Sequence, residues 1–293
     1  MNVPHPVSVL VLTKNEEMYI GRCLASVQWA DEIVVVDAGS EDGTREIAAA
    51  HGAVVHEQPW LGYAPQRNKA AELAANDWVF FIDADEIVTA DLARSIVETC
   101  ATELDPADGY SVLRRGDFLG VLLPNDQRRS RRREFIRLYN RRCSRWDPEQ
   151  IVHEQVIVPG RMRPLRGVLL HWRGQRMDEY VPTFNRYATL EAEMLARRGV
   201  RPTAAKLLYR PVLRFLWIYI RKGGFRLGAR GVIWALLAAS AEFFRYAKLW
   251  ERQHSVLTRD PPAEIAATAA PASRALITDG ARRALRRRRP ARR

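Results

Sequence analysis

The sequence predicts an α/β fold in which a parallel sheet fills the first hundred residues and helices form the C-terminal part. Three short runs rich in β-branched and aromatic residues, 7–12, 32–36 and 78–82, are each followed by polar residues and then by a helical pattern. Strands that alternate with helices form a parallel sheet. The 293 residues, 47% hydrophobic and 27% charged, have a globular composition and suffice for one large α/β domain with an appendage.

Helical periodicity fills the gaps between those strands. The segment 17–27 places five apolar side chains on one helical face, and 44–50 and 66–75 are typical of further crossover helices. A shorter strand is expected at 53–56. The first hundred residues therefore predict the order βαβαβαβ.

The pattern changes twice after this sheet. Between 105 and about 170, short strand-like pieces surround an Arg-rich loop at 128–133, which predicts an antiparallel extension that covers the site. From 177 to 250 the chain is mostly helical. From 261 onward Ala, Pro and Arg recur without apolar periodicity, which predicts a disordered tail.

The positive charge is concentrated at the C-terminal end. The chain has 46 Lys and Arg against 34 Asp and Glu, a formal net charge of +12, and eight of the arginines lie in 281–293 without any acid. Since 12 − 8 = 4, the rest of the chain carries only about +4. A polybasic tail attracts anionic lipid and nucleic acid alike, so the charge by itself selects no partner.

Cysteine use and the N-terminal residues predict a cytoplasmic protein. Cys23, Cys100 and Cys143 stand far apart and form no CxxC pair, which argues against a zinc site and a disulfide framework. The N-terminus has no basic segment, and the apolar run at 7–12 is too short for a signal peptide.

Polar and acidic residues follow three of the predicted strands. The strand ends read TKN at 13–15, DAGS at 37–40 and DADE at 83–86. In open parallel sheets, ligands bind beyond the carboxyl ends of the strands, so these residues predict one ligand site. Neither GxGxxG nor GxxxxGK[ST] is present, which argues against a dinucleotide site and a phosphate-binding loop.

Asp83 and Asp85 leave the sheet edge together, with one residue between them. Two carboxylates so placed can bind Mg²⁺ or Mn²⁺, which take carboxylate oxygen and keep positions free for phosphate. The alternative is that Asp83 ends the strand while Asp85 or Glu86 caps the next helix.

Asp37 ends its strand and enters a turn with two glycines that leads into a helix. A carboxylate at this position can accept a hydrogen bond from a nucleobase imide or a ribose hydroxyl. Capping of the following helix by Ser40 or Asp42 is the alternative.

Four segments in this order, VSVLVLTKNEE, ADEIVVVDAGSEDGT, PQRNKA and VFFIDADE, resemble the nucleotide-sugar half of family 2 glycosyltransferases. The resemblance implies the GT-A fold, the Rossmann-like fold of nucleotide-diphospho-sugar transferases. This chain has LTKN where the family usually has PTYN, and Asp37-Ala38 where two acids are frequent.

Those departures are similar to the branch of lipopolysaccharide-core β-1,4-glucosyltransferases. Later segments resemble the same branch: RLYNRR at 137–142, IVHEQV at 151–156, LLHW at 169–172 and a glycine-containing segment near 225–231. The resemblance covers residues 5 to 250 and leaves the Arg-rich tail outside.

The resemblance also implies roles for individual residues. Asp83 and Asp85 match the metal-binding DxD pair, and Glu154 is the candidate base that takes the proton of the acceptor hydroxyl during inversion. Asp117 and Asp126 are the reserves for the base, and a surface ion pair is the alternative for Glu154.

His153 and His171 could assist the metal or the diphosphate, or could be structural. The donor-binding residues are Thr13, Asn15, Asp37, Arg67 near the uridine or diphosphate, and Asp83.

The helical region predicts an amphipathic surface. Lys206, Arg210, Arg214 and Arg221 recur at spacings of four and seven, and a second charged set follows at 242–252. The uncharged stretch 231–241 is too short to span a bilayer, which needs about 20 residues. The tryptophans of this region suit helices lying among lipid headgroups, and ordinary packing on the first domain is the alternative.

We therefore expect a GT-A catalytic domain at 1–175, a membrane-docking region of C-terminal amphipathic helices at 176–258 and a disordered basic tail at 259–293. The expected activity is the inverting transfer of a sugar from a UDP-sugar donor to a lipopolysaccharide-core or other glycolipid acceptor. UDP-glucose is the first choice of donor, and the expected cofactor is Mg²⁺ or Mn²⁺. The enzyme would be cytoplasmic and peripherally attached to the anionic surface of the inner membrane.

The alternatives come from different classes of protein. One is a transferase acting on polyprenyl phosphate or another cell-envelope polysaccharide. A nucleotidyltransferase would open with a Gly-rich basic loop, which LTKNEE is not. A basic nucleic-acid-binding protein is suggested by the tail, but the acidic strand ends would repel a phosphate backbone, so no nucleic acid is expected.

Overall fold

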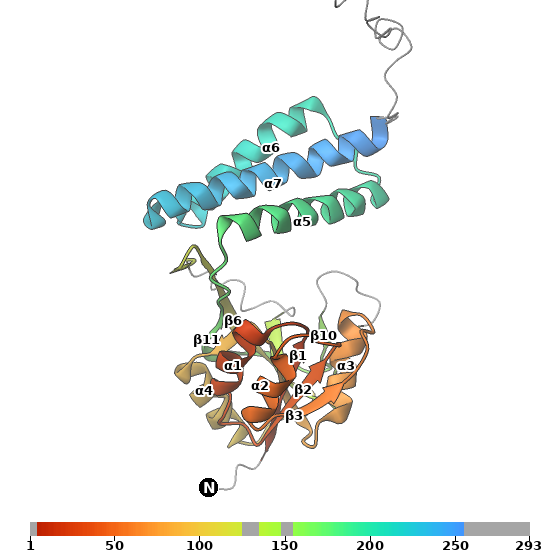
Figure 1. Cartoon of the computed structure of the whole chain (residues 1–293), viewed down its shortest axis with the longest axis vertical. Helices are drawn as coiled ribbons and strands as arrows, with labels where there is room; N and C mark the ends of the chain where they lie inside the picture. Colours follow the sequence, from red (N-terminus) through yellow and green to blue (C-terminus); the bar gives the residue numbers. More distant parts are fainter. Residues whose placement is uncertain (1–4, 125–134, 148–154, 255–293) are drawn as a thin grey trace, which may run out of the picture.

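The computed structural model describes residues 5–124, 135–147 and 155–254, and it confirms the α/β fold (Figure 1). Strands and helices alternate in the first part of the chain, at residues close to those predicted. The elements are β1 (Val7–Thr13), α1 (Glu17–Ala25), β2 (Glu32–Asp37), α2 (Thr44–Ala50), β3 (Val54–Glu57), α3 (Tyr63–Leu73), β4 (Trp78–Asp83), β5 (Glu86–Val88) and α4 (Ala90–Cys100).

The predicted parallel sheet forms half of a larger mixed sheet. Within the described residues this sheet has nine strands, eight of them in the order β3-β2-β1-β4-β8-β6-β11-β5, with β7 paired to β6. Strands β1, β2, β3 and β4 are parallel, and Thr13 lies opposite Asp37 at their carboxyl ends. The register therefore brings the polar strand ends to one edge.

Alternate residues of the central strands pack into two cores, one on each face of the sheet. Val9 and Val11 lie in the core shared with α1 and α4, whereas Leu10 lies in the core shared with α3. Successive side chains of a strand point to opposite faces, so a strand buried on both sides must be apolar throughout. This requirement explains the uninterrupted apolar run of β1.

The remaining strands form the expected antiparallel extension, with one difference. The strand β8 is antiparallel to both β4 and β6. The strand β11 is parallel to β6, with a register shift between Pro164 and Val168, and its ten residues make it longer than any strand expected there. The expected strand at 152–158 is described only from 155, as β10. The elements are β6 (Gly109–Phe118), β7 (Val121–Leu122), β8 (Ile136–Asn140), β9 (Arg145–Trp146), β10 (Val156–Ile157) and β11 (Met162–His171).

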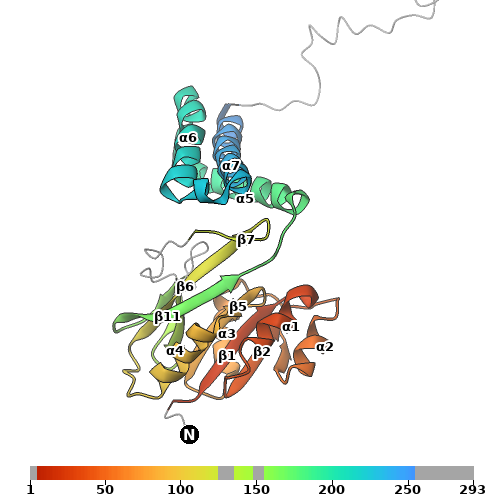
Figure 2. The same cartoon turned by 90° about the vertical axis from the view of Figure 1, so that its left-hand side faces the viewer.

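Helices of the C-terminal part form a separate layer beyond the end of β6 and β11 (Figure 2). Helix α7 packs against both α5 and α6. The elements are α5 (Met177–Arg197), α6 (Ala204–Leu216), a π-helical turn η3 (Trp217–Arg221), a 3₁₀ turn η4 (Gly224–Leu227) and α7 (Ala229–His254). Among the described residues, no helix is both long and apolar enough to cross a membrane.

Glycines explain the tight junction between η4 and α7. A Cβ on Gly231 would lie 1.8 Å from the carbonyl oxygen of Gly224, so no other residue fits without moving the backbone. Gly228 has φ +56°, a conformation that glycine adopts at little cost. The glycines of the segment noted in the sequence therefore allow the backbones of η4 and α7 to pack closely.

Charged side chains of α7 do not form the second amphipathic face predicted at 242–252. Glu242 is buried and pairs with Arg245 at 2.9 Å, and Arg245 also pairs with Glu191 of α5. Lys248 donates to the side-chain oxygen of Asn185 at 2.6 Å. These charges hold α7 to α5, because helices that pack closely can satisfy polar groups across their interface.

Candidate active site

A pocket of about 850 Å³ lies at the carboxyl ends of β1 and β4, with α5 on its opposite side. Thr13, Arg67, Asp83, Asp85 and His171, which the sequence had singled out, all line it. Helix α5 contributes three further lining residues, Thr183, Arg186 and Tyr187. The site is thus built by both layers of the molecule.

Thr13 presents an unused hydrogen-bonding group to this pocket. Its side chain is buried, and its hydroxyl oxygen has no hydrogen-bond partner among the described residues. A buried polar atom without a partner is costly unless a ligand or water satisfies it. The Thr13 hydroxyl is therefore available to a ligand or a water molecule in this pocket.

Asp37 and Asn15 lie beside the pocket, but the side chains of both are bonded to the turn after β2. The Asp37 carboxylate accepts hydrogen bonds from the backbone N–H of Gly39 at 3.0 Å and of Ser40 at 2.8 Å, and from the Ser40 hydroxyl. Asn15 accepts from the backbone N–H of Glu41 at 2.8 Å. Both side chains hold the turn after β2 against the end of β1, and neither lines the pocket.

Arg67 reaches the pocket from α3 across an aromatic floor. Its guanidinium lies over the rings of Trp146 and Phe81, with centroids at 4.3 and 4.9 Å, and approaches the Asp83 carboxylate to 3.9 Å. Arg137 lies 3.6 Å from the other oxygen of Asp83. Aromatic faces stabilise a guanidinium and fix the orientation of its plane, which suits the binding of a diphosphate.

Asp85 is held by His171, the last residue of β11, and by Arg173 just beyond it. Its Oδ2 atom lies 3.0 Å from Nε2 of His171 and 2.8 Å from a guanidinium nitrogen of Arg173. Burial by itself would raise the pKa of Asp85, but the His171 hydrogen bond and the charges of His171, Arg173 and Arg114 outweigh it and lower the pKa to about 2. Asp85 is therefore ionised at neutral pH.

The helix-capping alternative for Asp85 and Glu86 is wrong. Glu86 begins β5 rather than a helix, and α4 begins only at Ala90. Glu86 is 0% exposed and its carboxylate pairs with Arg114 and, at 3.4 Å, with Arg137. It also accepts the backbone N–H of Asp83 at 3.0 Å. Glu86 thus stabilises the turn that carries Asp83 and Asp85.

The sequence did not indicate Glu16, Arg114 or Arg173 as site residues. Arg173 joins the two acidic strand ends, because it pairs with Asp85 and, at 3.3 Å, with Glu16. Burial raises the pKa of Glu16 although Arg173 acts to lower it. Two of these residues adjoin recognised motifs, which could have indicated them: Glu16 follows TKN in the first loop, and Arg173 directly follows LLHW.

Asp117, a reserve for the base, has a structural position. Its two carboxylate oxygens accept the backbone N–H groups of Arg173 at 3.0 Å and of Gly174 at 3.2 Å. These bonds fix the segment that presents Arg173 to the pocket. Glu154, the candidate base, lies outside the described residues, as do His153, Asp126 and the loop 128–133.

The two aspartates of the pocket fit a divalent cation that is held jointly by protein carboxylates and by the diphosphate of a bound nucleotide. In the part of the chain that the structure describes, no three His, Cys, Asp or Glu side chains are grouped to hold a metal ion by themselves. Mg²⁺ at nucleotide sites is usually held by one or two carboxylates together with substrate phosphates. Asp83, whose cationic neighbours lie beyond hydrogen-bonding distance, and Asp85 supply two such carboxylates.

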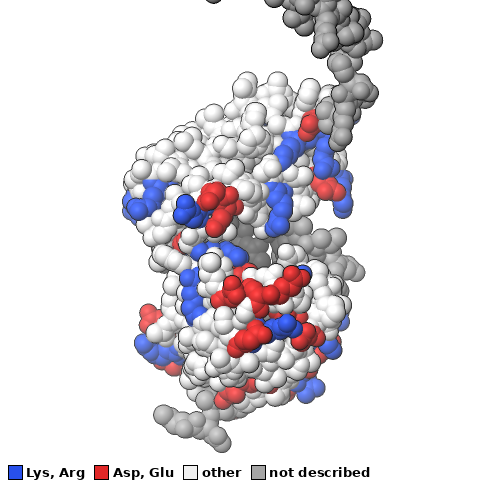
Figure 3. Space-filling model, viewed as in Figure 1, with Lys and Arg blue, Asp and Glu red and all other residues white. Residues whose placement is uncertain are grey.

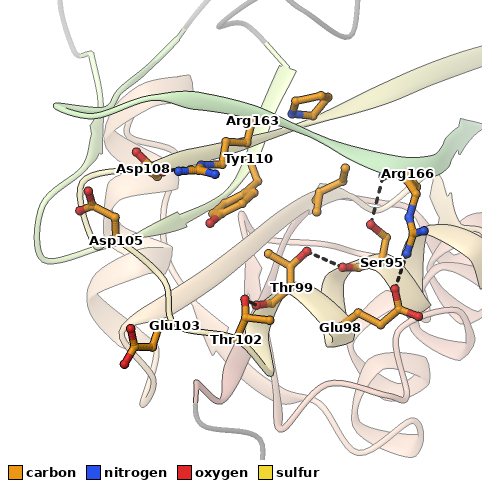
Figure 4. A pocket seen from close by; sticks show the side chains of 12 residues that line it. Ser95, Glu98, Thr99, Thr102, Glu103, Asp105, Asp108, Tyr110, Arg163 and Arg166 are labelled. Carbon is orange, nitrogen blue, oxygen red and sulfur yellow. Dashed lines mark hydrogen bonds and ion pairs between the residues drawn. The ribbon is translucent and has the colours of Figure 1, made fainter.

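A second pocket of about 480 Å³ lies at the opposite edge of the sheet, between α4 and the beginnings of β6 and β11 (Figure 4). Its charged residues largely pair with each other: Arg163 binds Asp108 at 2.6 Å, and Arg166 binds Glu98. None of the predicted site residues lines it. The amino ends of the strands are also the wrong edge for ligands in this class of sheet.

A parallel sheet with paired aspartates at its carboxyl edge, extended by antiparallel strands, defines the class of GT-A transferases. The model of the family named Glycosyl transferase family 2 matches residues 8–163, and the chain belongs to this family. The family resemblance expected from the four sequence segments is therefore confirmed.

Several relatives match most of the chain, among them the following two. The lipopolysaccharide core biosynthesis glycosyltransferase LpsC of Rhizobium meliloti is 36% identical over 260 residues, covering 87% of this chain and 95% of LpsC. An uncharacterized glycosyltransferase of Rickettsia typhi, RT0209, is 31% identical over 259 residues, covering 84% of this chain and 87% of that protein.

Solved structures with distant similarity include the following two. TarS 1-349 of S. aureus in complex with UDP-GlcNAc has 18% identity and a TM-score of 0.44, covering 87% of this chain and 94% of that one. The mannosyltransferase PcManGT of Pyrobaculum calidifontis, in complex with GDP-Man and Mn²⁺, has 19% identity and a TM-score of 0.46, covering 90% and 79%.

Proposed function

We propose that this family 2 glycosyltransferase is an inverting, metal-dependent enzyme that transfers a sugar, glucose from UDP-glucose as the first choice, to a lipopolysaccharide-core or other glycolipid acceptor. One observation carries the proposal: Asp83, Asp85, Arg67 and Thr13 line a single pocket at the carboxyl edge of the sheet. Two carboxylates, a guanidinium and an unpartnered hydroxyl match the parts of a nucleotide-diphosphate donor.

Each group has a distinct task toward the donor. Thr13 would bind the nucleobase through its free hydroxyl, and Arg67 would bind the diphosphate with the guanidinium that Trp146 supports. Asp37 and Asn15, predicted as direct contacts, would act on the nucleoside by shaping the turn 37–41 beside it. Trp60 and Tyr63, which line the same pocket and pack edge to face at 4.9 Å, would bound the donor on the α3 side.

Asp83 and Asp85 would hold Mg²⁺ or Mn²⁺ together with the donor diphosphate. When bound, the cation would offset the negative charge on the departing nucleotide. His171 and Arg173 keep Asp85 ionised and oriented. Glu86 holds the turn between the aspartates in place through the backbone N–H of Asp83.

Glu154 would take the proton from the acceptor hydroxyl as that oxygen attacks opposite the leaving diphosphate. Direct displacement of this kind inverts the anomeric carbon and needs no covalent enzyme intermediate. Asp117 is a weaker candidate than the sequence implied, because both its oxygens are engaged by backbone N–H groups.

The acceptor class rests on the similarity to LpsC over most of both chains. Arg186, Tyr187 and Thr183 of α5 face the pocket from the side opposite the donor-binding strands and would contact the acceptor. Polyprenyl phosphate remains the alternative acceptor. Such substrates lie at the cytoplasmic surface of the inner membrane, where we place the enzyme.

Thermal shift with nucleotide sugars tests the donor site. We expect UDP-sugars to raise the melting temperature in the presence of Mn²⁺ and to lose most of this effect in EDTA, with GDP- and ADP-sugars as comparison ligands. Arg67→Met should weaken the shift, whereas Arg142→Met, which removes a surface arginine paired with Asp77, is the matched control. Equal shifts with every nucleotide sugar, or none with any, would overturn the proposed donor site.

A further inference from the structure

Helix α6 and the turn η3 display a continuous apolar stripe on the side that faces away from α7. Leu208 is 75% exposed and Val212 is 57% exposed, and the stripe recurs at the three- and four-residue spacing of one helical face. Its members are Leu208, Tyr209, Val212, Leu213, Leu216, Trp217 and Ile220. Soluble helices place polar residues on such a face.

The opposite side of the same segment makes the intramolecular contacts. Ile218 is buried against Ala235 and Ala238 of α7, and Phe215 packs at the edge of this cluster. The exposed stripe is therefore an addition to a helix pair that is already packed. Four large apolar residues of α7, Val232, Leu236, Phe243 and Phe244, are also exposed.

Charge in this region has one sign. Residues 194–241 contain ten Lys and Arg and no Asp or Glu. Two of these cations flank the stripe directly: the guanidinium of Arg214 and the ammonium of Lys222 lie 5.1 and 4.6 Å from the ring centroid of Trp217. In Figure 3 the upper part of the helical body is mostly white, and the blue and red patches of this body lie along its lower edge and its right side.

We propose that the stripe of α6 and η3 is the surface by which this protein binds an anionic lipid bilayer. Apolar side chains would enter the boundary between headgroups and acyl chains, and the neighbouring cations would bind headgroup phosphates. Charge complementarity favours lipid over a second copy of the chain, because two copies of this basic surface would repel each other. The proposal concerns attachment alone and does not depend on the transfer reaction.

The structure thereby assigns the expected membrane contact to a particular face. Arg245 and Lys248 of α7 are turned toward α5, so they belong to the fold rather than to the lipid surface. Of the basic residues first noted on this helix, Arg214 lies beside Trp217 of the stripe, whereas Arg210 pairs with Glu242 of α7 at 3.7 Å and belongs to the helix interface. Apolar insertion thus contributes together with charge, and binding should persist in part when charge is screened.

Sedimentation of the full-length protein with vesicles tests the proposal. Vesicles of phosphatidylcholine alone and of phosphatidylcholine with one quarter phosphatidylglycerol are compared at low salt and at 0.5 M NaCl. We expect binding to the anionic vesicles at low salt and a reduced but measurable fraction at high salt, where attraction by the Arg-rich tail is screened.

A matched pair of double variants isolates the stripe. Leu208→Gln with Val212→Gln should lower the vesicle partition coefficient by roughly tenfold or more at both salt concentrations, because two exposed aliphatic groups no longer enter the interface. Val181→Gln with Leu190→Gln changes residues of similar exposure on α5, 51% and 50%, and should leave binding unchanged. Circular dichroism and melting temperature confirm that both pairs fold.

Three results would overturn the proposal. The first is wild-type protein that does not sediment with anionic vesicles, and the second is equal binding by the two double variants. The third is a dimer detected by light scattering that the α6 pair converts to monomers, since the stripe would then bind a second copy. Loss of transfer to a soluble acceptor in the α6 pair would show instead that the helix supports the catalytic domain.

Discussion

The pocket and the helical body depart from an ordinary protein surface in opposite ways. In the pocket, acidic side chains are taken out of water: Asp85 is 7% exposed. On α6, large apolar side chains remain in water, and they form a stripe rather than isolated residues. Globular proteins normally place charge outside and large apolar groups inside, so each region carries a cost to stability.

The cost of buried charge in the pocket is offset within the chain, whereas the cost of exposed apolar surface on α6 is not. Buried carboxylates are tolerated because Glu86 pairs with Arg114 and Arg137, and Asp85 with Arg173, within the same chain. Exposed apolar groups of α6 have no comparable partner among the described residues. The ion pairs hold the carboxylates of the pocket in place for chemistry, whereas we expect the stripe of α6 to be covered by lipid.

Substitution of the paired aspartates should have the largest effect. We expect Asp83→Asn or Asp85→Asn to abolish transfer and to remove the metal dependence of nucleotide binding, because an amide is a poorer ligand for a hard cation. The fold should survive, as a melting curve would show. Wild-type turnover by both variants would make the metal assignment wrong.

Glu154→Gln should lower the transfer rate by about 10²- to 10⁴-fold with little change in donor binding, because the variant keeps its shape but loses the proton acceptor. Slow hydrolysis of the sugar nucleotide should fall in parallel, since water needs the same base. Near-normal transfer, alongside an inactive Asp117→Asn or Asp126→Asn, would move the base to the preceding loop.

Substitution of Glu86 compares the stability contributed by a buried ion pair with that contributed by a surface ion pair. We expect Glu86→Gln to lower the free energy of unfolding by about 3–5 kcal/mol, because Arg114 and Arg137 would lose a buried counter-ion. Asp77→Asn, which breaks exposed pairs with Arg141 and Arg142, should cost about 0–1 kcal/mol. Urea unfolding of both variants measures the contrast, and similar losses would show that burial does not govern these pairs.

Acid should weaken the fold partly through Asp85. Its pKa lies near 2 in the folded protein and its ordinary value is 3.8, so the ionised form stabilises the fold above pH 4 and this contribution is lost as the pH falls from 4 to 2. The lowering corresponds to about 2 kcal/mol. Stability curves of the wild type and Asp85→Asn should converge across this range, and curves that stay parallel would contradict the pairing.

Asp37 should show the smallest and most selective effect. Asp37→Ala is expected to raise the donor KM with the metal site intact, because the turn beside the nucleoside loses its acceptor. Asp37→Asn keeps an acceptor for the Gly39 and Ser40 N–H groups and should retain most of the donor affinity. Equal loss in both variants would indicate a direct contact between the carboxylate and the donor, and a loss confined to kcat would exclude both roles.

Local sequence determined the elements and part of the site. The strands β1, β2 and β4 and the DAD turn were readable because apolar runs, helical spacing and a strand-ending carboxylate are properties of neighbouring residues. The parallel order followed, since strands joined through helices align, and this order placed Thr13, Asp83 and Asp85 at one edge.

Only the tertiary structure decided which partners those residues meet and which faces stay open. Arg173 is 88 residues from Asp85 in the chain, and the pairing of β11 with β5 and β6 brings the two together. The spacing of basic residues on α6 likewise showed a charged side but not that the apolar side faces outward, because packing against α7 chooses the buried face. Contacts between distant segments depend on topology, whereas periodicity reports only the residues next to one another.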